Sequence, residues 1–237
     1  MPVRRVLITG ASKGIGRAVA DRVAQAGDAP VGLARTAPKD FPGEFYPVDF
    51  TDVAATAAAL ESIVAAGRVD AVVNNFGYAR WGAIGAIDLN DLSPTYDLNM
   101  RVAVQVTQAA LPGMRAQQWG RIVNVTSLVT LGTPLRTPYA AAKAALEAAT
   151  RVWAAELAQS GITVNAVAPG PTETEMYRSR SPVGSAQEAG LLRTIPMRRL
   201  ATPVEIAHAI CALLDEDAGY ITGQILRADG GGSVCAA

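Results

Sequence analysis

Tyr139 and Lys143 are the two side chains in this sequence whose types and spacing are best suited to proton transfer. Residues four apart lie on one face of an α-helix, so the phenol and the ammonium would be neighbours. A free tyrosine has a pKa of about 10. Because a nearby ammonium favours the phenolate, the pair predicts a group that gives or takes a proton at a substrate oxygen.

A glycine-rich segment near the start of the sequence could bind a phosphate. It reads TGASKGIG over residues 9–16 and lies between a strand-like run and a helix-like pattern. Glycine lets the backbone turn sharply and approach a ligand, and the N-terminus of the next helix attracts a pyrophosphate. The spacing G-x-x-x-G-x-G differs from the common G-x-G-x-x-G. A simple tight turn is the alternative, but the position between strand and helix favours a phosphate site.

Charged residues follow the second and third predicted strands. Arg35 comes about 20 residues after the glycine loop, where an acidic residue would hold a ribose 2′-hydroxyl and an arginine accommodates a 2′-phosphate. Lys13 could add a second positive charge, although both cations could instead be solvated surface groups. Asp49 could reach an adenine, or it could cap the helix that begins near residue 51.

The elements that must position these residues alternate between short apolar runs and longer helix-like segments, which is typical of βαβ units. Continuous β-branched runs such as 69–73 and 162–167 indicate buried parallel strands. The predicted fold is α/β, a Rossmann-type doubly wound sheet of about seven parallel strands with helices on both faces. Its ligand site should lie beyond the carboxyl ends of the strands. Strands are predicted near 6–8, 31–34, 45–48, 69–73, 121–125, 162–167 and 224–227, and helices near 15–26, 54–66, 94–117 and 203–214, with one more capped by Thr137 and opened by Pro138.

Composition bounds the class of protein. The 237 residues include 21 basic and 21 acidic side chains and are 50% hydrophobic, with no linker-like break, so we expect one domain over 1–237. Zero formal net charge argues against nucleic acid, and no apolar run is long enough for a membrane span. The start of the sequence lacks a signal-peptide pattern, and the two cysteines make no disulfide framework, which predicts a cytoplasmic location.

Two features invite other chemistry. His208 and Cys211 are three residues apart on one predicted helix and could be metal ligands, but His208 is the only histidine, so a core helix face is expected and no metal site is predicted. Cys235, near the end of the sequence, is expected to be an exposed thiol. Residues 171–196 show no legible period and are predicted to form a mobile lid over cofactor and substrate.

Further motifs at strand ends complete a pattern. With the glycine loop, they make the sequence resemble the short-chain dehydrogenase/reductase family from about residue 6 to residue 231, essentially the whole chain. These motifs are Asn74-Asn75-Phe76-Gly77, Asn99, Ser127, Tyr139-xxx-Lys143 and Asn165-xxx-Pro169-Gly170 with Thr174.

The resemblance implies a catalytic group of four residues. Tyr139 would be the general acid in ketone reduction and the base in alcohol oxidation, and Lys143 would lower its pKa and hold the nicotinamide ribose. Ser127 would hydrogen-bond the substrate oxygen. Asn99 would anchor a water that links Lys143 to solvent. The alternatives are that Ser127 only ends a strand and that Asn99 only bonds to its own helix.

The resemblance also implies a nicotinamide dinucleotide, NADP(H) in preference to NAD(H) because of Arg35 and Lys13. Asn74 is expected to be structural, bonding across the sheet. The family is usually tetrameric, so a homotetramer, or a homodimer, is expected. The implied cofactor contacts are Gly10, Ser12, Lys13, Gly14, Ile15, Gly16, Arg35, Asp49, Phe50, Asn75, Gly77, Tyr139, Lys143, Pro169, Gly170, Thr172 and Thr174.

The sequence departs from the family pattern in two places. Phe76 stands where an alanine is usual, which puts a phenyl ring close to the cofactor. The stretch from Ser127 to Tyr139 is one residue short, so Thr126 is an alternative hydroxyl, although the strand pattern favours Ser127.

The wording of the motifs is nearest to the 3-oxoacyl-acyl-carrier-protein reductases. The two basic positions that this branch uses to dock the carrier protein are Gln118 and Ser160 here, which should weaken that encounter. Other arginines could substitute, so docking of a carrier protein stays open; they are Arg115, Arg121, Arg178 and Arg180.

The expected activity is NADPH-dependent reduction of a ketone, in a 3-oxoacyl thioester or another hydrophobic carbonyl compound, to a secondary alcohol. Apolar residues near the expected site either contact a hydrophobic substrate or pack the lid; they are Trp81, Leu128, Met176 and Tyr177. One alternative is an NADP-dependent dehydrogenase of a different small alcohol. Another is a catalytically silent dinucleotide-binding sensor or scaffold. An epimerase or dehydratase of the extended relatives is disfavoured because no separate substrate domain is present.

Overall fold

A seven-stranded parallel sheet in the order β3-β2-β1-β4-β5-β6-β7 forms the centre of the molecule. The computed structural model describes residues 3–234, and Cys235 lies outside them. The predicted fold class is confirmed, and the order reverses between β1 and β4, where open α/β sheets bind ligands. The strands are β1 (Arg5–Thr9), β2 (Ala29–Ala34), β3 (Glu44–Pro47), β4 (Ala71–Asn74), β5 (Gly120–Val125), β6 (Ile162–Pro169) and β7 (Ile225–Ala228).

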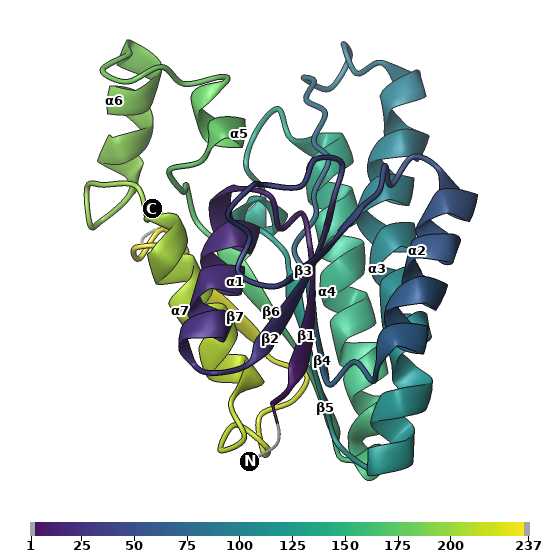
Figure 1. The fold of residues 1–237 in the computed structure, drawn as a ribbon. Helices are drawn as coiled ribbons and strands as arrows, with labels where there is room; N and C mark the ends of the chain where they lie inside the picture. Colours follow the sequence, from purple (N-terminus) through teal and green to yellow (C-terminus); the bar gives the residue numbers. More distant parts are fainter. Residues whose placement is uncertain (1–2, 235–237) are drawn as a thin grey trace.

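Helices cover both faces of this sheet (Figure 1). One pair, α1 (Gly14–Gln25) and α7 (Pro203–Leu214), packs together on one face, and α2 (Val53–Ala66), α3 (Leu92–Gln117) and α4 (Thr137–Leu157) cover the other. Short α5 (Glu175–Arg178) and α6 (Ala186–Thr194) lie above the carboxyl ends of the strands. The described part of the chain also contains the 3₁₀ turns η1 (Leu89–Asp91), η2 (Leu128–Leu131) and η3 (Ala158–Ser160).

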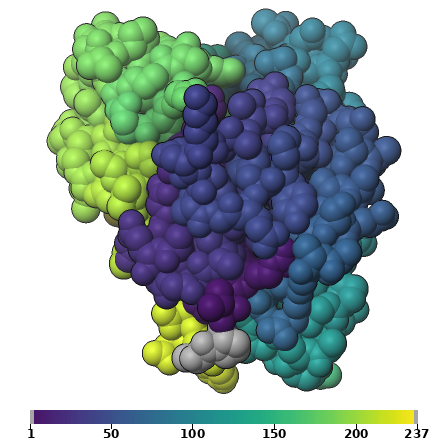
Figure 2. Space-filling model, viewed as in Figure 1, coloured from purple at the N-terminus to yellow at the C-terminus, as the bar shows by residue number. Residues whose placement is uncertain are grey.

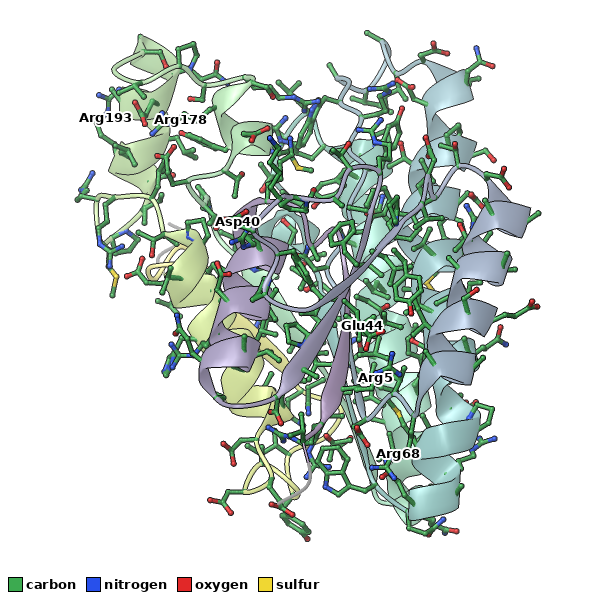
Figure 3. The ribbon with its side chains drawn as sticks, viewed as in Figure 1. Arg5, Asp40, Glu44, Arg68, Arg178 and Arg193 are labelled. Carbon is green, nitrogen blue, oxygen red and sulfur yellow. The ribbon has the colours of Figure 1, made fainter. Side chains whose placement is uncertain are left out.

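Alternating strand residues supply two separate cores. In β1, Leu7 belongs to the core under α2, α3 and α4, whereas Val6 and Ile8 belong to the core under α1 and α7. Because successive strand side chains point to opposite faces, an uninterrupted apolar strand serves both. Figure 3 shows that ion pairs stay outside these cores; Arg5, for example, binds Glu44 of β3 at 2.9 Å.

A chain of polar side chains crosses the middle of the sheet. Asn74 Nδ2 donates to Asn124 Oδ1 of β5 at 2.8 Å and to Thr107 Oγ1 of α3 at 3.1 Å. Asn124 Nδ2 in turn donates to Thr150 Oγ1 of α4 at 2.9 Å. All four residues are buried, so the chain fixes two strands against two helices. The predicted structural role of Asn74 is confirmed.

Two predicted helix caps are wrong. Thr137 is the first residue of α4 rather than its cap; Arg136 holds the cap position and makes no side-chain cap bond, although a proline opens the helix as predicted. Asp52, not Asp49, caps α2 by accepting a hydrogen bond from the Ala55 amide at 2.8 Å. Local turn geometry decides both cases, and the sequence holds two adjacent candidates each time.

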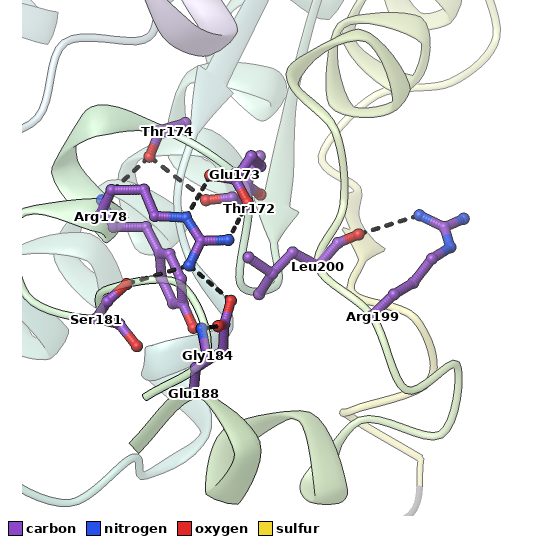
Figure 4. Close-up of polar contacts among 10 residues, drawn as sticks. Thr172, Glu173, Thr174, Arg178, Ser181, Gly184, Glu188, Arg199 and Leu200 are labelled. Atoms are coloured by element: carbon purple, nitrogen blue, oxygen red, sulfur yellow. Dashed lines mark hydrogen bonds and ion pairs between the residues drawn. The ribbon is translucent and has the colours of Figure 1, made fainter. Parts of the chain in front are cut away.

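The lid, defined as residues 171–196, is not irregular, because it contains α5 and α6. Arg178 of α5 joins its parts: it pairs with the carboxylate of Glu173, donates to Glu188 Oε1 of α6 at 2.6 Å and donates to the Ser181 carbonyl at 3.2 Å (Figure 4). Burial in this network explains why the helices form despite weak periodicity. In the space-filling view the lid is one of two lobes at this end of the molecule, and the segment around residue 85 belongs to the other (Figure 2).

Candidate functional site

Three of the four predicted catalytic residues meet at Gly77, just beyond β4. A β-carbon on Gly77 would lie 3.6 Å from Asn99 Oδ1, 3.6 Å from Lys143 Nζ and 3.8 Å from Tyr139 Oη. The segment after β4, helix α3 and helix α4 therefore bring an amide, an ammonium and a phenol around one point. Only a residue without a side chain leaves that point open to a ligand.

Lys143 is buried, with 1% of its surface exposed. Its Nζ donates to the Val125 carbonyl at the end of β5 at 2.8 Å. Burial disfavours the charged ammonium and lowers the pKa of Lys143 to about 7. A lysine that gains and loses its proton near neutral pH is suited to passing protons to a neighbour.

Burial also raises the pKa of Tyr139 to about 12. This shift is opposite to the one expected from a neighbouring ammonium. The reason is that Lys143 Nζ lies 5.7 Å from the centre of the Tyr139 ring and is itself desolvated, so burial outweighs its charge. In this state the phenol is an acid that holds its proton at neutral pH.

Asn99 connects α3 to the segment after β4. Its Nδ2 donates to the Tyr78 carbonyl at 2.6 Å and to the Thr95 carbonyl of its own helix at 2.7 Å, and its Oδ1 accepts from the Tyr78 amide at 3.4 Å. The bond to its own helix expected as the alternative is present. The bonds to Tyr78 show that Asn99 also holds the backbone next to Gly77.

Of the two candidate hydroxyls, Thr126 is buried and its Oγ1 donates to the Val167 carbonyl at 3.3 Å. Ser127 is partly exposed at the start of η2, and its Oγ accepts from the Val129 amide at 3.3 Å. The Ser127 hydroxyl hydrogen is free to bond a substrate oxygen. The geometry therefore favours Ser127, as the strand pattern predicted.

The glycine loop is closely packed and ends in an open helix terminus. A β-carbon on Gly16 would lie 2.4 Å from the Gly10 carbonyl oxygen, and Gly10 and Gly14 have φ of +67° and +57°. Lys13 precedes α1 without a side-chain cap bond, so the first amides of the helix, at Gly14 and Ile15, can face an anion.

Asn75 and Phe76 hold this loop against β4. Asn75 Nδ2 donates to the Thr9 carbonyl at 2.9 Å, and the Phe76 amide donates to Thr9 Oγ1 at 2.9 Å. The Phe76 ring packs on buried Phe50, with ring centres 4.6 Å apart, and joins the core under α2 and α3. The unusual phenylalanine is thus accommodated in the core.

Charged groups surround the loop. Arg35 is exposed directly after β2. Lys13 forms an exposed ion pair with Glu175 of the lid. Asp49 accepts from the Thr51 amide and hydroxyl at 2.9 and 2.8 Å, and these bonds lower its pKa. Asp49 thus closes a local turn and stays ionised.

The remaining predicted contacts lie at the end of β6. Gly170 is so close to Asp229 that a β-carbon would lie 2.7 Å from the Asp229 Cα. Thr172 is buried, and Thr174 caps α5 while its Cγ2 lies 3.4 Å from the β-carbon position of Gly14. Pro169 and Gly170 end the strand, and Ser12 is partly exposed in the glycine loop. Residues 9–16 and 169–174 therefore form two walls of one site, with donors that fit a dinucleotide.

One further group beside Tyr139 has no spacing signal in the sequence. The ring of Trp81 lies edge-on to Tyr139, with centres 5.6 Å apart. The guanidinium carbons of Arg136 and Arg180 lie 3.6 Å and 4.1 Å from the centre of the Trp81 ring. Of the other apolar residues predicted here, Met176 is exposed and Tyr177 has a buried hydroxyl without a partner among residues 3–234.

Elsewhere, His208 Nδ1 lies 2.8 Å from Arg22 Nη2, and Cys211 packs against the core, where burial raises its pKa to about 11. Residues 3–234 contain no cluster of three or more histidine, cysteine or acidic side chains placed to hold a metal ion. Nor does any helix in that range have the length and apolar character to span a membrane.

Comparison with known proteins agrees with this geometry. Residues 10–233 match the family model described as "Enoyl-(Acyl carrier protein) reductase". The 3-oxoacyl-[acyl-carrier-protein] reductases FabG of Vibrio harveyi and Escherichia coli are each 37% identical, covering 95% of both chains. The (2S)-[(R)-hydroxy(phenyl)methyl]succinyl-CoA dehydrogenase subunit BbsD of Thauera aromatica is 36% identical over 98% of both chains.

Solved structures match along the whole chain. The structure described as "ElxO with NADP Bound" superposes with a TM-score of 0.90 at 31% identity, covering 98% of this chain and 99% of that one. The ligand-free aldohexose dehydrogenase of Thermoplasma acidophilum gives 0.92 at 28% identity, covering 99% and 95%. Sequence, fold and site agree, and the chain belongs to the short-chain dehydrogenase/reductase family.

Proposed function

We propose that this protein uses NADPH to reduce a ketone, in a 3-oxoacyl thioester or another hydrophobic carbonyl compound, to a secondary alcohol. The observation that carries the proposal is the convergence of Tyr139, Lys143 and Asn99 on Gly77. A buried lysine is costly for a fold. A protein that only bound a dinucleotide would not need one beside a tyrosine.

The cofactor would supply the hydride, and the protein would hold it in place. Amides of the glycine loop would bind the pyrophosphate, and Arg35 would bind the 2′-phosphate. The similar ElxO structure, which is described with NADP bound, supports this choice. Lys143, Asn75 and Thr174 line the stretch between the loop and Tyr139 and would hold the nicotinamide end.

Tyr139 would give its proton to the substrate oxygen, and Ser127 would donate a hydrogen bond to the same oxygen. The raised pKa of Tyr139 keeps the phenol protonated at neutral pH, which suits reduction better than oxidation. Lys143, held by the Val125 carbonyl, would return a proton to Tyr139.

The FabG relatives, which are named as 3-oxoacyl reductases, support a 3-oxoacyl thioester as substrate. Support for a carrier protein is thinner, because Gln118 and Ser160 are neutral. Two of the four arginines considered as substitutes are engaged inside the protein: Arg121 donates to the Asp215 and Glu216 carbonyls at 3.1 Å, and Arg178 holds the lid together. A free thioester is therefore the first substrate to test.

The test follows NADPH oxidation with acetoacetyl-CoA, with NADH in parallel. We expect turnover with NADPH and a loss of roughly 10²–10⁴-fold in Tyr139→Phe, with NADPH affinity retained. Tyr96→Phe, at an exposed tyrosine of α3, is the matched control. Full activity in Tyr139→Phe, or no binding of either cofactor, would contradict the proposal.

A further inference from the structure

The strongest unexplained feature is the pair of arginines on Trp81. Arg136 precedes α4, Arg180 belongs to the lid, and Trp81 follows β4, so three distant segments meet beside Tyr139. Both guanidinium carbons lie within 4.1 Å of one ring centre. They are therefore less than about 8 Å apart, no farther than the Debye length in physiological salt.

Neither charge is neutralised within the part of the chain that the structure describes. The ion pairs of residues 3–234 include Arg80 with Asp91 at 3.0 Å nearby, but none of Arg136 or Arg180. Burial lowers the pKa of Arg136; burial and then the charges of Arg136 and Arg80 lower that of Arg180. Two cations that repel each other in a chain of zero formal net charge leave an uncompensated positive site at the substrate end.

Stacking on a tryptophan does not use up a guanidinium. The contact occupies the flat face, and the N–H donors on the edge remain available for a planar anion. Each arginine has five such donors. Among the described residues, the one hydrogen bond made by either side chain is a long one, from Arg180 Nη2 to the Ala79 carbonyl at 3.5 Å.

We infer that the substrate carries an anionic group, a carboxylate or a phosphate, which Arg136 and Arg180 bind while its ketone faces Tyr139. This inference rests on the proposed function and specifies its substrate. Trp81 is 5.6 Å from Tyr139 and within 4.1 Å of both arginines, so the anion lies less than about 10 Å from the phenol ring. It therefore belongs to the ketone-bearing molecule close to the carbonyl, not to the far end of a long thiol carrier.

The test compares ketones that differ only in charge. 4-Oxopentanoate and 5-oxohexanoate are paired with their methyl esters, and dihydroxyacetone phosphate is paired with dihydroxyacetone. Reduction is followed as NADPH oxidation, and binding is measured by calorimetry on the NADPH complex of Tyr139→Phe, where turnover is blocked. We expect at least one anion to have a kcat/KM and an affinity tenfold or more above those of its neutral partner. The better pair identifies carboxylate or phosphate.

Arginine variants assign the preference to this site. Arg136→Gln and Arg180→Gln should each reduce the anion-to-neutral ratio at least tenfold, and Arg180→Lys should retain part of it. Arg193→Gln is the matched control, because this arginine of α6 loses the same charge away from Trp81 (Figure 3). The ratio should stay unchanged there.

The outcomes separate this inference from the proposed function. Equal affinity for anion and neutral partner, no binding of any anion, or a ratio that neither arginine variant changes overturns the inference, even if acetoacetyl-CoA is reduced. Preferential binding of an anion through Arg136 and Arg180 without reduction of any ketone supports the inference and contradicts the reductase.

Discussion

The cofactor end of the site, at residues 9–16 and 74–77, takes its shape from the backbone, whereas the substrate end takes its shape from side chains. At the first end, glycines leave room, and the Asn75 amide ties two loops together. At the second, Trp81, Arg136 and Arg180 come from three segments and meet by stacking. The comparison teaches that a common cofactor can be held by a fixed frame while the substrate contacts stay free to vary.

Gly16→Ala should break the cofactor end most severely. Its new methyl group would lie 2.4 Å from the Gly10 carbonyl, so the loop must move. Overpacking of this kind costs about 2–3 kcal/mol, or roughly 30–100-fold in NADPH affinity, which fluorescence titration measures. Gly27→Ala is the control, because Gly27 has φ of +86° but no atom within 4 Å of its β-carbon position. Unchanged affinity in Gly16→Ala would show that the loop is not a rigid frame.

Arg35→Ala should change the cofactor preference by a smaller factor. Losing a charge-assisted contact to the 2′-phosphate costs about 1.5–2 kcal/mol, or roughly 10–30-fold in NADPH affinity, with little effect on NADH. Lys39→Ala, at another exposed cation of the segment after β2, should leave both affinities within about twofold. Equal losses for NADPH and NADH would contradict the assignment of Arg35 to the 2′-phosphate.

The pH profile tests the proton-transfer group between the two ends. With its pKa lowered to about 7, Lys143 is charged below that pH and neutral above it. Reduction needs its proton, so kcat/KM should fall roughly tenfold per pH unit above about 7. Lys143→Arg should lose this step, whatever its residual activity, because a guanidinium stays charged. A flat wild-type profile between about pH 6 and 9 would exclude Lys143 as the proton source.

Glu175→Gln should give the smallest effect. The exposed pair of Glu175 with Lys13 competes with any phosphate for the lysine, and such pairs contribute about 0–1 kcal/mol. NADPH should therefore bind up to about fivefold more tightly in the variant. Glu61→Gln, which removes an exposed carboxylate of α2, is the control. Weaker binding in Glu175→Gln would mean that the carboxylate supports the cofactor rather than competing with it.

Much of the cofactor end could be predicted from sequence, since a strand, a glycine loop and a helix are consecutive and each leaves a local pattern. The neighbours of Tyr139 were partly predictable: helical spacing paired it with Lys143, but the direction of its pKa shift depends on burial, which spacing does not give. The arginines on Trp81 were out of reach, because residues 81, 136 and 180 share no period or motif. Their contact exists only once the lid is folded over the segment after β4.

The lid has a narrow neck. The Glu173 amide donates to the Ala201 carbonyl at 2.8 Å, and the Ala201 amide donates to the Pro171 carbonyl at 3.0 Å, so the segment leaves and returns to the sheet at nearly the same place. Between these points Arg178 binds the parts to one another rather than to the strands. A lid of this kind is a cassette: a different length or sequence could be grafted between residues 173 and 201 without disturbing the sheet register. New substrate ranges could arise by exchanging the cassette while the hydride and proton chemistry below it stays the same.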